Sequence, residues 1–169
     1  MQTDHNDHSS STFVEISSEG VEPPSWIDAM AGFARRVMQR LGLAGMELSI
    51  LLCDNATIQR LNREYREIDA PTDVLSFGQE GEAIPAEGQP PYLGDIVVAL
   101  PFVEKQAKEV GVPEEEELRR MVVHGILHLA GHEHGTETME TKEQSKMLSL
   151  QEQILEELST QSSWSSDSF

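Results

Sequence analysis

The chain has 169 residues and a formal net charge of −18, from 30 acidic and 12 basic residues. This length supports one domain with a full hydrophobic core, and no apolar run approaches the roughly 20 residues of a membrane span. The acidic balance argues against a general nucleic-acid binder, because contacts with phosphates need lysine and arginine.

The first 42 residues predict a tail, a strand and a helix. Residues 1–11 are rich in Ser, Asp and Asn and predict a disordered tail. In residues 12–16 polar and apolar side chains alternate enough to predict a first strand. Ser25 is the expected N-cap of a helix whose apolar residues recur at helical spacing, and Gly42 is expected to end it.

A buried strand over residues 46–53 and a second helix are predicted next. Asp54 or Asn55 is the expected N-cap of that helix. Arg63 and Arg66 lie three residues apart and therefore share one side of it. Pairing of Arg66 with Glu67 or Asp69 on a solvated surface is the structural alternative to a role in catalysis.

The second half predicts two strands and three helices. The strands cover residues 72–77 and 93–99, and no helix separates them, so they should pair antiparallel. Thr72, Asp73 and Ser76 are expected to fix the turn and the strand entry. The helices are predicted at these positions: from Pro101 to Val110, from Glu114 to Leu129, and from about Glu137 to Leu158.

This order of elements predicts an α+β fold, a small mixed four-stranded sheet packed with about five helices. Residues 12–158 should form a single domain, followed by a flexible tail over 159–169. Half of the basic residues lie within residues 25–77, so an arginine-bearing face on an acidic body could still guide RNA to one place.

One cysteine, Cys53, follows Leu51 and Leu52, which predicts a buried thiol that cannot form an internal disulfide. The polar, acidic N-terminus does not read as a secretory signal. Both observations predict a reducing, cytoplasmic location. A nucleophilic role for Cys53 has no neighbouring base to support it.

Four of the six histidines fall between residues 124 and 134. His124 and His128 are four residues apart, which on a helix places them about 40° apart and roughly 6 Å along the axis. Gly131 offers the left-handed conformation that often ends a helix, so the chain can turn and bring back His134. Three imidazole ligands with a vacant fourth position are typical of a catalytic zinc. His132 is the weakest ligand candidate of the four.

The sequence lacks the general base of a zinc metalloprotease. The protease pattern is His-Glu-x-x-His, and Gly125 occupies the position of its glutamate. A glycine there cannot move a proton, but it allows close approach to the helix.

Several separated motifs together resemble the YbeY endoribonuclease family. They are Asn62-Arg-Glu-Tyr-Arg66, Thr72-Asp-Val-Leu-Ser-Phe77, Gly94-Asp-Ile96 and the histidine segment 124–134. The match runs from about residue 12 to residue 158 in the expected order. Glu133 stands where the family usually has aspartate, which leaves any role of that carboxylate open.

The resemblance implies a single-strand-specific endoribonuclease that depends on one zinc ion (Zn²⁺). Its ligands would be His124, His128 and His134, and Arg66 would be the catalytically important arginine. The family acts in maturation of the 3′ end of small-subunit rRNA and in removal of defective ribosomes. The implied partners are single-stranded rRNA, small ribosomal subunit proteins and the GTPase Era.

The sequence leaves alternatives for the attacking group, for the general base, for the function and for the metal. The attacking group is either water or the ribose 2′-hydroxyl, and zinc-activated hydroxide acts either alone or with help from His132 or Glu133. A ribosome-assembly factor with a mainly structural zinc is one alternative function. A metal-dependent hydrolase of another substrate is the second, which the missing glutamate weakens. Imidazole sites also accept other transition metals.

Overall fold

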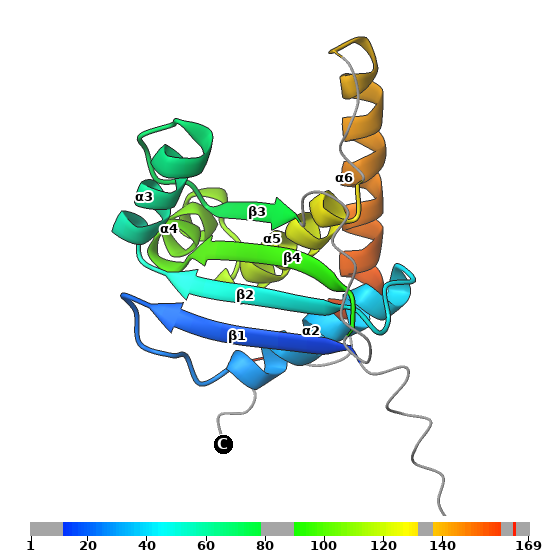
Figure 1. Ribbon diagram of the computed structural model, residues 1–169, viewed down its shortest axis with the longest axis horizontal. Coiled ribbons are helices and arrows are strands. Elements are labelled where there is room, and N and C mark those ends of the chain that lie inside the picture. Colours follow the sequence, from blue (N-terminus) through cyan, green and yellow to red (C-terminus); the bar gives the residue numbers. More distant parts are fainter. Residues whose placement is uncertain (1–11, 79–89, 132–136, 160–163, 165–169) are drawn as a thin grey trace, which may run out of the picture.

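The computed structural model describes residues 12–78, 90–131, 137–159 and Trp164 (Figure 1). In these residues the chain forms a mixed four-stranded sheet and five helices, which confirms the predicted α+β class. The predicted tail over 1–11 lies outside the described residues. Within helix α6 (Glu137–Ser159), side chains are described from Lys146 onward.

The sheet has the strand order β1-β2-β4-β3. The strands are β1 (Phe13–Glu19), β2 (Glu47–Cys53), β4 (Tyr92–Ala99) and β3 (Val74–Gly78). The first three run parallel, whereas β3 runs antiparallel to β4, as expected for two strands with no helix between them (Figure 1). β3 is an edge strand of the described sheet, so one row of its backbone groups is available to other elements.

The other helices are α2 (Ile27–Arg40), α3 (Asn55–Arg66), α4 (Leu100–Val110) and α5 (Glu114–Leu129). Asp54 is the N-cap of α3, because its side chain accepts a hydrogen bond from the Thr57 amide at 2.9 Å. The expected N-cap of α2 at Ser25 is wrong: Trp26 occupies that position and makes no side-chain capping bond. The chain forms a turn at Ser25 instead.

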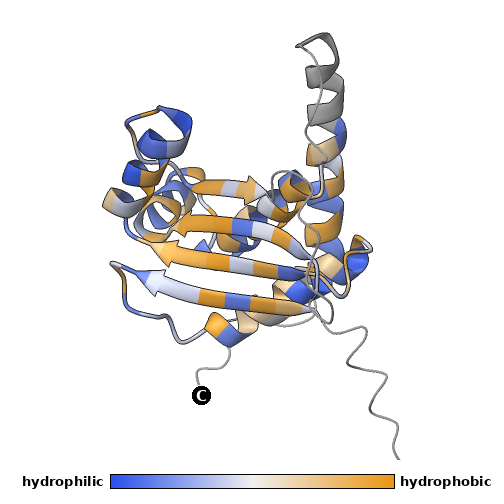
Figure 2. Ribbon diagram, viewed as in Figure 1, coloured by the Kyte–Doolittle hydropathy of each residue, from blue (hydrophilic) through white to orange (hydrophobic). Residues whose placement is uncertain are grey.

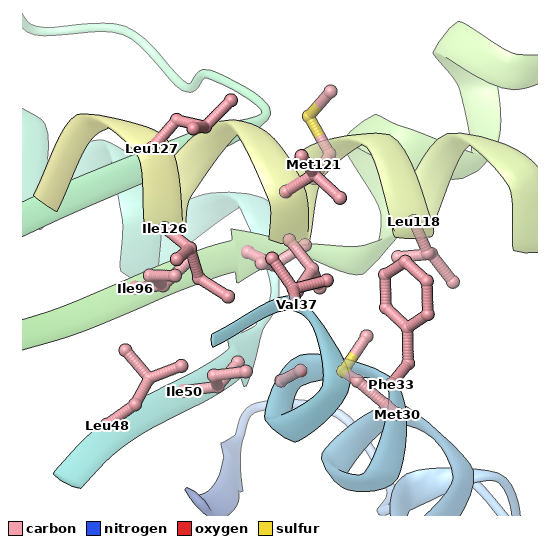
Figure 3. Close-up of a cluster of buried hydrophobic side chains, with 14 of the residues drawn as sticks. Met30, Phe33, Val37, Leu48, Ile50, Ile96, Leu118, Met121, Ile126 and Leu127 are labelled. Carbon is pink, nitrogen blue, oxygen red and sulfur yellow. The ribbon is translucent and has the colours of Figure 1, made fainter. Parts of the chain in front are cut away.

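The main hydrophobic core lies between one face of the sheet and helices α2, α5 and α6. Strand residues such as Ile50 and Ile96 meet Val37 of α2 and Ile126 of α5, all almost fully buried (Figure 3). Figure 2 shows the matching apolar stretches along the central strands. This packing fixes α5 against the sheet, and α5 carries the first two predicted metal ligands.

A smaller core lies on the opposite face of the sheet, under α3. Cys53 and Ile58 are fully buried there beside Val97. The expected buried thiol is therefore confirmed. The smaller cover leaves part of this sheet face accessible.

Trp164 lies inside the segment 159–169 that the sequence predicts to be flexible, yet its side chain is 2% exposed. Its ring stacks on Trp26 at a centroid distance of 5.5 Å and meets the edge of Phe33 at 5.8 Å. The Trp164 amide donates to Glu115 Oε2 at 3.0 Å. The serines around Trp164 do not predict this contact, because its partners lie far away along the chain. For the undescribed residues around Trp164 the predicted flexibility stays a prediction.

In the part of the chain that the structure describes, we find no helix with both the length and the apolar character needed to cross a membrane.

Candidate metal and catalytic site

Helix α5 places His124 and His128 on one face. The helix begins with four successive glutamates after Pro113, where negative charge is stabilised by the helix dipole. Two turns further on, the rings of His124 and His128 lie 4.4 Å apart between centroids. Their Nε2 atoms face each other at 2.9 Å. The convergence predicted from the four-residue spacing is thus present for these two imidazoles.

Gly125, between the two histidines, is the contact point of α5 with the sheet. A Cβ atom at this position would lie 2.7 Å from Cδ1 and 3.0 Å from Cγ1 of Ile96 in β4. Any larger residue would therefore push the helix away from the strand. The close approach expected at Gly125 is therefore observed, and the approaching group is the buried side chain of Ile96.

The end of α5 also matches the sequence prediction. The helix ends at Leu129, and Gly131 has the left-handed backbone conformation with φ of 90°. The third predicted ligand, His134, lies outside the described residues, as do His132 and Glu133. Among the described side chains no three potential metal ligands converge, so the prediction for His134 stays a prediction.

A glutamine of α6 completes the surroundings of His124. Gln151 Oε1 lies 2.9 Å from His124 Nδ1, and the Gln151 residue is only 4% exposed. The oxygen can only accept, so Nδ1 carries a proton, and in the neutral ring Nε2 then keeps its lone pair. The lone pair therefore points toward His128.

The glutamine is in turn held by an ion pair between α5 and α6. Gln151 Nε2 donates to Glu152 Oε2 at 3.3 Å. Arg120 donates to both oxygens of Glu152, at 3.0 and 3.2 Å. The hydrogen bond from Arg120 lowers the pKa of Glu152 and, in return, raises the pKa of Arg120. Both groups therefore stay charged.

Polar contacts continue from Arg120 to the start of β3. Arg120 Nη1 donates to the buried carboxylate of Glu117 at 3.2 Å, and Gln106 Nε2 donates to the same carboxylate at 2.6 Å. Gln106 Nε2 also lies 3.2 Å from Asp73 Oδ2. Asp73 Oδ1 accepts from the Val74 amide at 2.7 Å, which fixes the entry into the strand. The structural role expected of Asp73 is supported by these bonds.

The described residues fit a zinc ion. Two ring nitrogens 2.9 Å apart need either a proton on one of them or a metal ion bound to both. An ion about 2.0–2.1 Å from each nitrogen can reach both atoms at that separation. Neutral imidazole nitrogen is a preferred zinc ligand, and a hydrogen bond on the other ring nitrogen is its usual accompaniment. His124 has both features.

Arg66 lies at the end of α3 beside the edge strand. Its Nη2 donates to the Ser76 carbonyl of β3 at 2.8 Å, and its guanidinium lies 5.6 Å from the centre of the Phe77 ring. The ion pair with Asp69 belongs to Arg63 instead, at 3.4 Å. Arg66 is exposed, so most of its five N–H donors can face solvent or a ligand.

Aromatic side chains surround this arginine. Tyr65 is 65% exposed and meets the Phe77 ring edge-on at 5.4 Å. Both rings line a groove of about 400 Å³ on the part of the sheet face that α3 leaves open. Asp95 lies at the same groove and accepts a hydrogen bond from Tyr92 at 2.5 Å. Burial, reinforced by the Asp95 bond, raises the pKa of Tyr92 to about 12.

Comparison with known proteins decides the family. The family model for endoribonuclease YbeY matches residues 15–159. The chain belongs to the endoribonuclease YbeY family. As a member of it, the chain is an endoribonuclease, which hydrolyses phosphodiester bonds. The family is one of metalloproteins, in agreement with the two converging imidazoles.

Individual relatives cover most of the chain. The endoribonuclease YbeY of Treponema pallidum (strain Nichols) is 41% identical over 84% of this chain and 87% of its own length. The endoribonuclease YbeY of Geobacillus kaustophilus is 40% identical over 83% of this chain and 88% of its own length. The solution structure of TM1509 from Thermotoga maritima superposes with a TM-score of 0.62 at 29% identity, covering 86% of this chain and 88% of that one. The chain therefore shares about 40% of its aligned residues with the two relatives and the fold of TM1509.

Sequence analysis missed Gln151, although a signal was present. The apolar residues Met147, Leu150, Ile154 and Leu158 recur at helical spacing and mark the inner face of α6 in the sequence. Gln151 lies four residues after Met147 and three before Ile154, so it falls on the same face. A polar residue at an inward position needs a partner, and that partner is His124.

Proposed function

We propose that this chain is a zinc-dependent, single-strand-specific endoribonuclease that matures the 3′ end of small-subunit rRNA and takes part in removing defective ribosomes. The observation that supports it most is the convergence of His124 and His128 Nε2 atoms on one face of α5. The metal ligands in this proposal are His124, His128 and His134. Arg66 is the catalytic arginine.

Each described residue has a distinct task in this proposal. A bound zinc ion supplies a Lewis acid, which polarises a phosphoryl oxygen or lowers the pKa of water from 15.7 to about 7. His124 and His128 hold that ion through their Nε2 atoms. Arg66 binds a phosphoryl oxygen through donors that stay charged at any working pH, and it neutralises the charge that gathers there during cleavage.

The surroundings of Arg66 support a single-stranded substrate. Unpaired bases stack on aromatic rings, and duplexes keep those faces covered. Tyr65 and Phe77 offer such rings beside the arginine at the open groove. The net charge of −18 of the whole chain disfavours binding of RNA at surfaces that lack such an arginine. We propose small ribosomal subunit proteins and the GTPase Era as partners, in the cytoplasm.

His128→Ala tests the proposal, because it removes one ligand while leaving the core of α5 in place. The purified variant should lose bound zinc and cleavage of a small-subunit rRNA precursor together. Elemental analysis measures the metal, gel electrophoresis of the RNA measures cleavage, and circular dichroism shows that the helices remain. Chelator should abolish cleavage by the unaltered chain, and added zinc should restore it.

Gln153→Ala is the matched control, since Gln153 lies on the exposed face of α6 and donates a hydrogen bond to Glu157 of the same helix. It should keep zinc and activity. Cleavage by His128→Ala at the rate of the unaltered chain would assign the activity to another site. If the unaltered chain bound zinc but cleaved no RNA, the result would favour a ribosome-assembly factor with a structural zinc.

A further inference from the structure

Gln151 occupies a position where an apolar residue would ordinarily pack. Its neighbours on the inner face of α6, Met147 and Ile154, are 2% and 0% exposed and belong to the main core. Burying an amide there costs free energy unless its oxygen and nitrogen both find partners. Both do, since the oxygen meets His124 and the nitrogen meets Glu152.

The orientation of the Gln151 amide is fixed by charge. An amide can be turned over, which would present its NH₂ group to His124. Glu152 prevents this, because its carboxylate can only accept and therefore attracts the NH₂ group. Arg120 holds that carboxylate with two hydrogen bonds at 3.0 and 3.2 Å. The Gln151 oxygen is left facing His124.

The orientation of the amide determines which nitrogen of His124 can bind a metal. An imidazole that donates from Nδ1 is unprotonated at Nε2, and Nε2 is the atom that faces His128. The opposite tautomer would place a proton between the two Nε2 atoms on the His124 side and leave its lone pair toward Gln151. A free imidazole in water samples both tautomers, so the contact removes an unproductive state.

We propose that Gln151 is a positioning residue of the metal site: it holds His124 as the Nδ1-protonated tautomer and thereby presents Nε2 for metal binding. Glu152 and Arg120 act one step further out, by fixing the Gln151 amide. The inference rests on the proposed metal site, and it assigns to α6 a task beyond closing the core.

Three substitutions separate positioning from packing. Gln151→Leu fills the buried space but removes the acceptor. Gln151→Glu keeps an oxygen acceptor at the same reach and therefore serves as the conservative rescue. Gln153→Leu is the matched control, because Gln153 lies two residues along on the exposed face of α6.

The first measurement is zinc affinity of the full chain, by competition with a chromogenic chelator. Gln151→Leu should weaken zinc binding by about 10- to 100-fold, as removal of such an outer partner does in other zinc proteins. Gln151→Glu should recover most of the affinity, and Gln153→Leu should leave it unchanged. Thermal unfolding followed by circular dichroism checks that each variant is folded.

The second measurement reads the tautomer directly and needs no substitution at position 151. Long-range ¹H–¹⁵N correlation spectra of the unaltered chain, with His124→Ala for assignment, should show His124 protonated at Nδ1 with and without zinc. An Nε2-protonated His124 in the zinc-free chain would overturn the proposal even if Gln151→Leu failed to fold.

The outcomes also distinguish this inference from the proposed function. If the unaltered chain binds no zinc, the metal site itself is wrong. If the unaltered chain binds zinc and Gln151→Leu binds it equally well, the site stands and Gln151 does not position it. Equal weakening by Gln151→Leu and Gln151→Glu would mean that an oxygen acceptor at this position does not support metal binding, and would overturn the positioning role.

Discussion

The histidine pair and Arg66 are held in opposite ways. His124 and His128 lie partly buried on α5, and His124 is fixed through Gln151 and Glu152 of α6 to Arg120. Arg66 is exposed at the end of α3 and is held by one backbone carbonyl and one aromatic ring. The candidate ligand His124 is thus held rigidly by its neighbours, whereas Arg66 has two contacts at the surface.

The difference matches what each group would bind in the proposed function. A metal ion needs its ligands within a few tenths of an ångström of fixed positions, so their neighbours must restrict them. An arginine that meets a phosphoryl oxygen acts through charge and several donors, which tolerate movement of the chain. Substitutions near the histidines should therefore change metal affinity and stability, whereas those near Arg66 should change turnover alone.

The largest effect should come from Arg66→Glu. It reverses the charge that meets the phosphoryl oxygen, so the cleavage rate should fall by about 100- to 1000-fold. Bound zinc and the melting temperature should stay as in the unaltered chain, because Arg66 makes one exposed hydrogen bond. Single-turnover cleavage of a short unpaired RNA measures the rate, and elemental analysis measures the zinc.

Arg63→Glu is the matched control for charge, because Arg63 lies one turn earlier on α3 and is likewise exposed, paired with Asp69. Its loss of rate should be much smaller. Equal losses in both variants would show that only the overall positive charge of α3 matters. An unchanged rate in Arg66→Glu would remove Arg66 from the catalytic site.

Gly125→Ala should disturb the rigid half of the site. Its Cβ would lie 2.7 Å from Ile96 Cδ1, so either the buried Ile96 side chain must repack or α5 must move away from β4 with both histidines. Overpacking of this kind costs about 1–3 kcal/mol, and the better helix propensity of alanine offsets about 1 kcal/mol of that. We expect a lower free energy of unfolding in urea together with weaker zinc binding.

Two further variants sharpen this prediction. Gly125→Ala combined with Ile96→Val should recover part of both losses, because valine lacks the clashing Cδ1 atom. Gly32→Ala in α2 meets only ordinary contacts, the nearest at 3.7 Å, so it should stabilise the chain by about 0.5–1 kcal/mol. A Gly125→Ala variant as stable as Gly32→Ala would show that α5 is free to shift.

The smallest effect concerns the small hydrophobic core under α3, which contains Cys53. Burial in the small core, aided by the charges of Asp54 and Glu19, raises the pKa of the Cys53 thiol to about 12. An unfolded chain ionises the same thiol near pH 8.5. The unfolded state therefore binds fewer protons between these two values, and the free energy of unfolding should fall as the pH rises through that window.

Thiol labelling at pH 8 tests whether Cys53 is buried in the native chain. Cys53 should react only when the chain unfolds, so labelling should accelerate in urea in step with unfolding. Fast labelling of the native chain would show that α3 opens on its own. Such an opening would move Arg66 together with the whole helix.

The sequence by itself determined the order of the elements and identified the candidate metal ligands. Helical periodicity and the glycine at 131 predicted α5 and its end, because both depend on neighbours along the chain. The four-residue spacing predicted that His124 and His128 converge, since helix geometry fixes it. The local cap at Asp54 was predicted for the same reason, whereas that at Ser25 was not observed.

Only the tertiary structure decided which distant residues meet. Gln151 contacts His124 from 27 residues away, Trp164 packs against Trp26, and Ser76 accepts a hydrogen bond from Arg66. Such contacts depend on how helices and strands pack across the sheet, and a residue's own neighbours in the chain carry little information about that. The sequence could thus name the imidazoles, but the packing of α6 on α5 decided which nitrogen of His124 is offered to a metal.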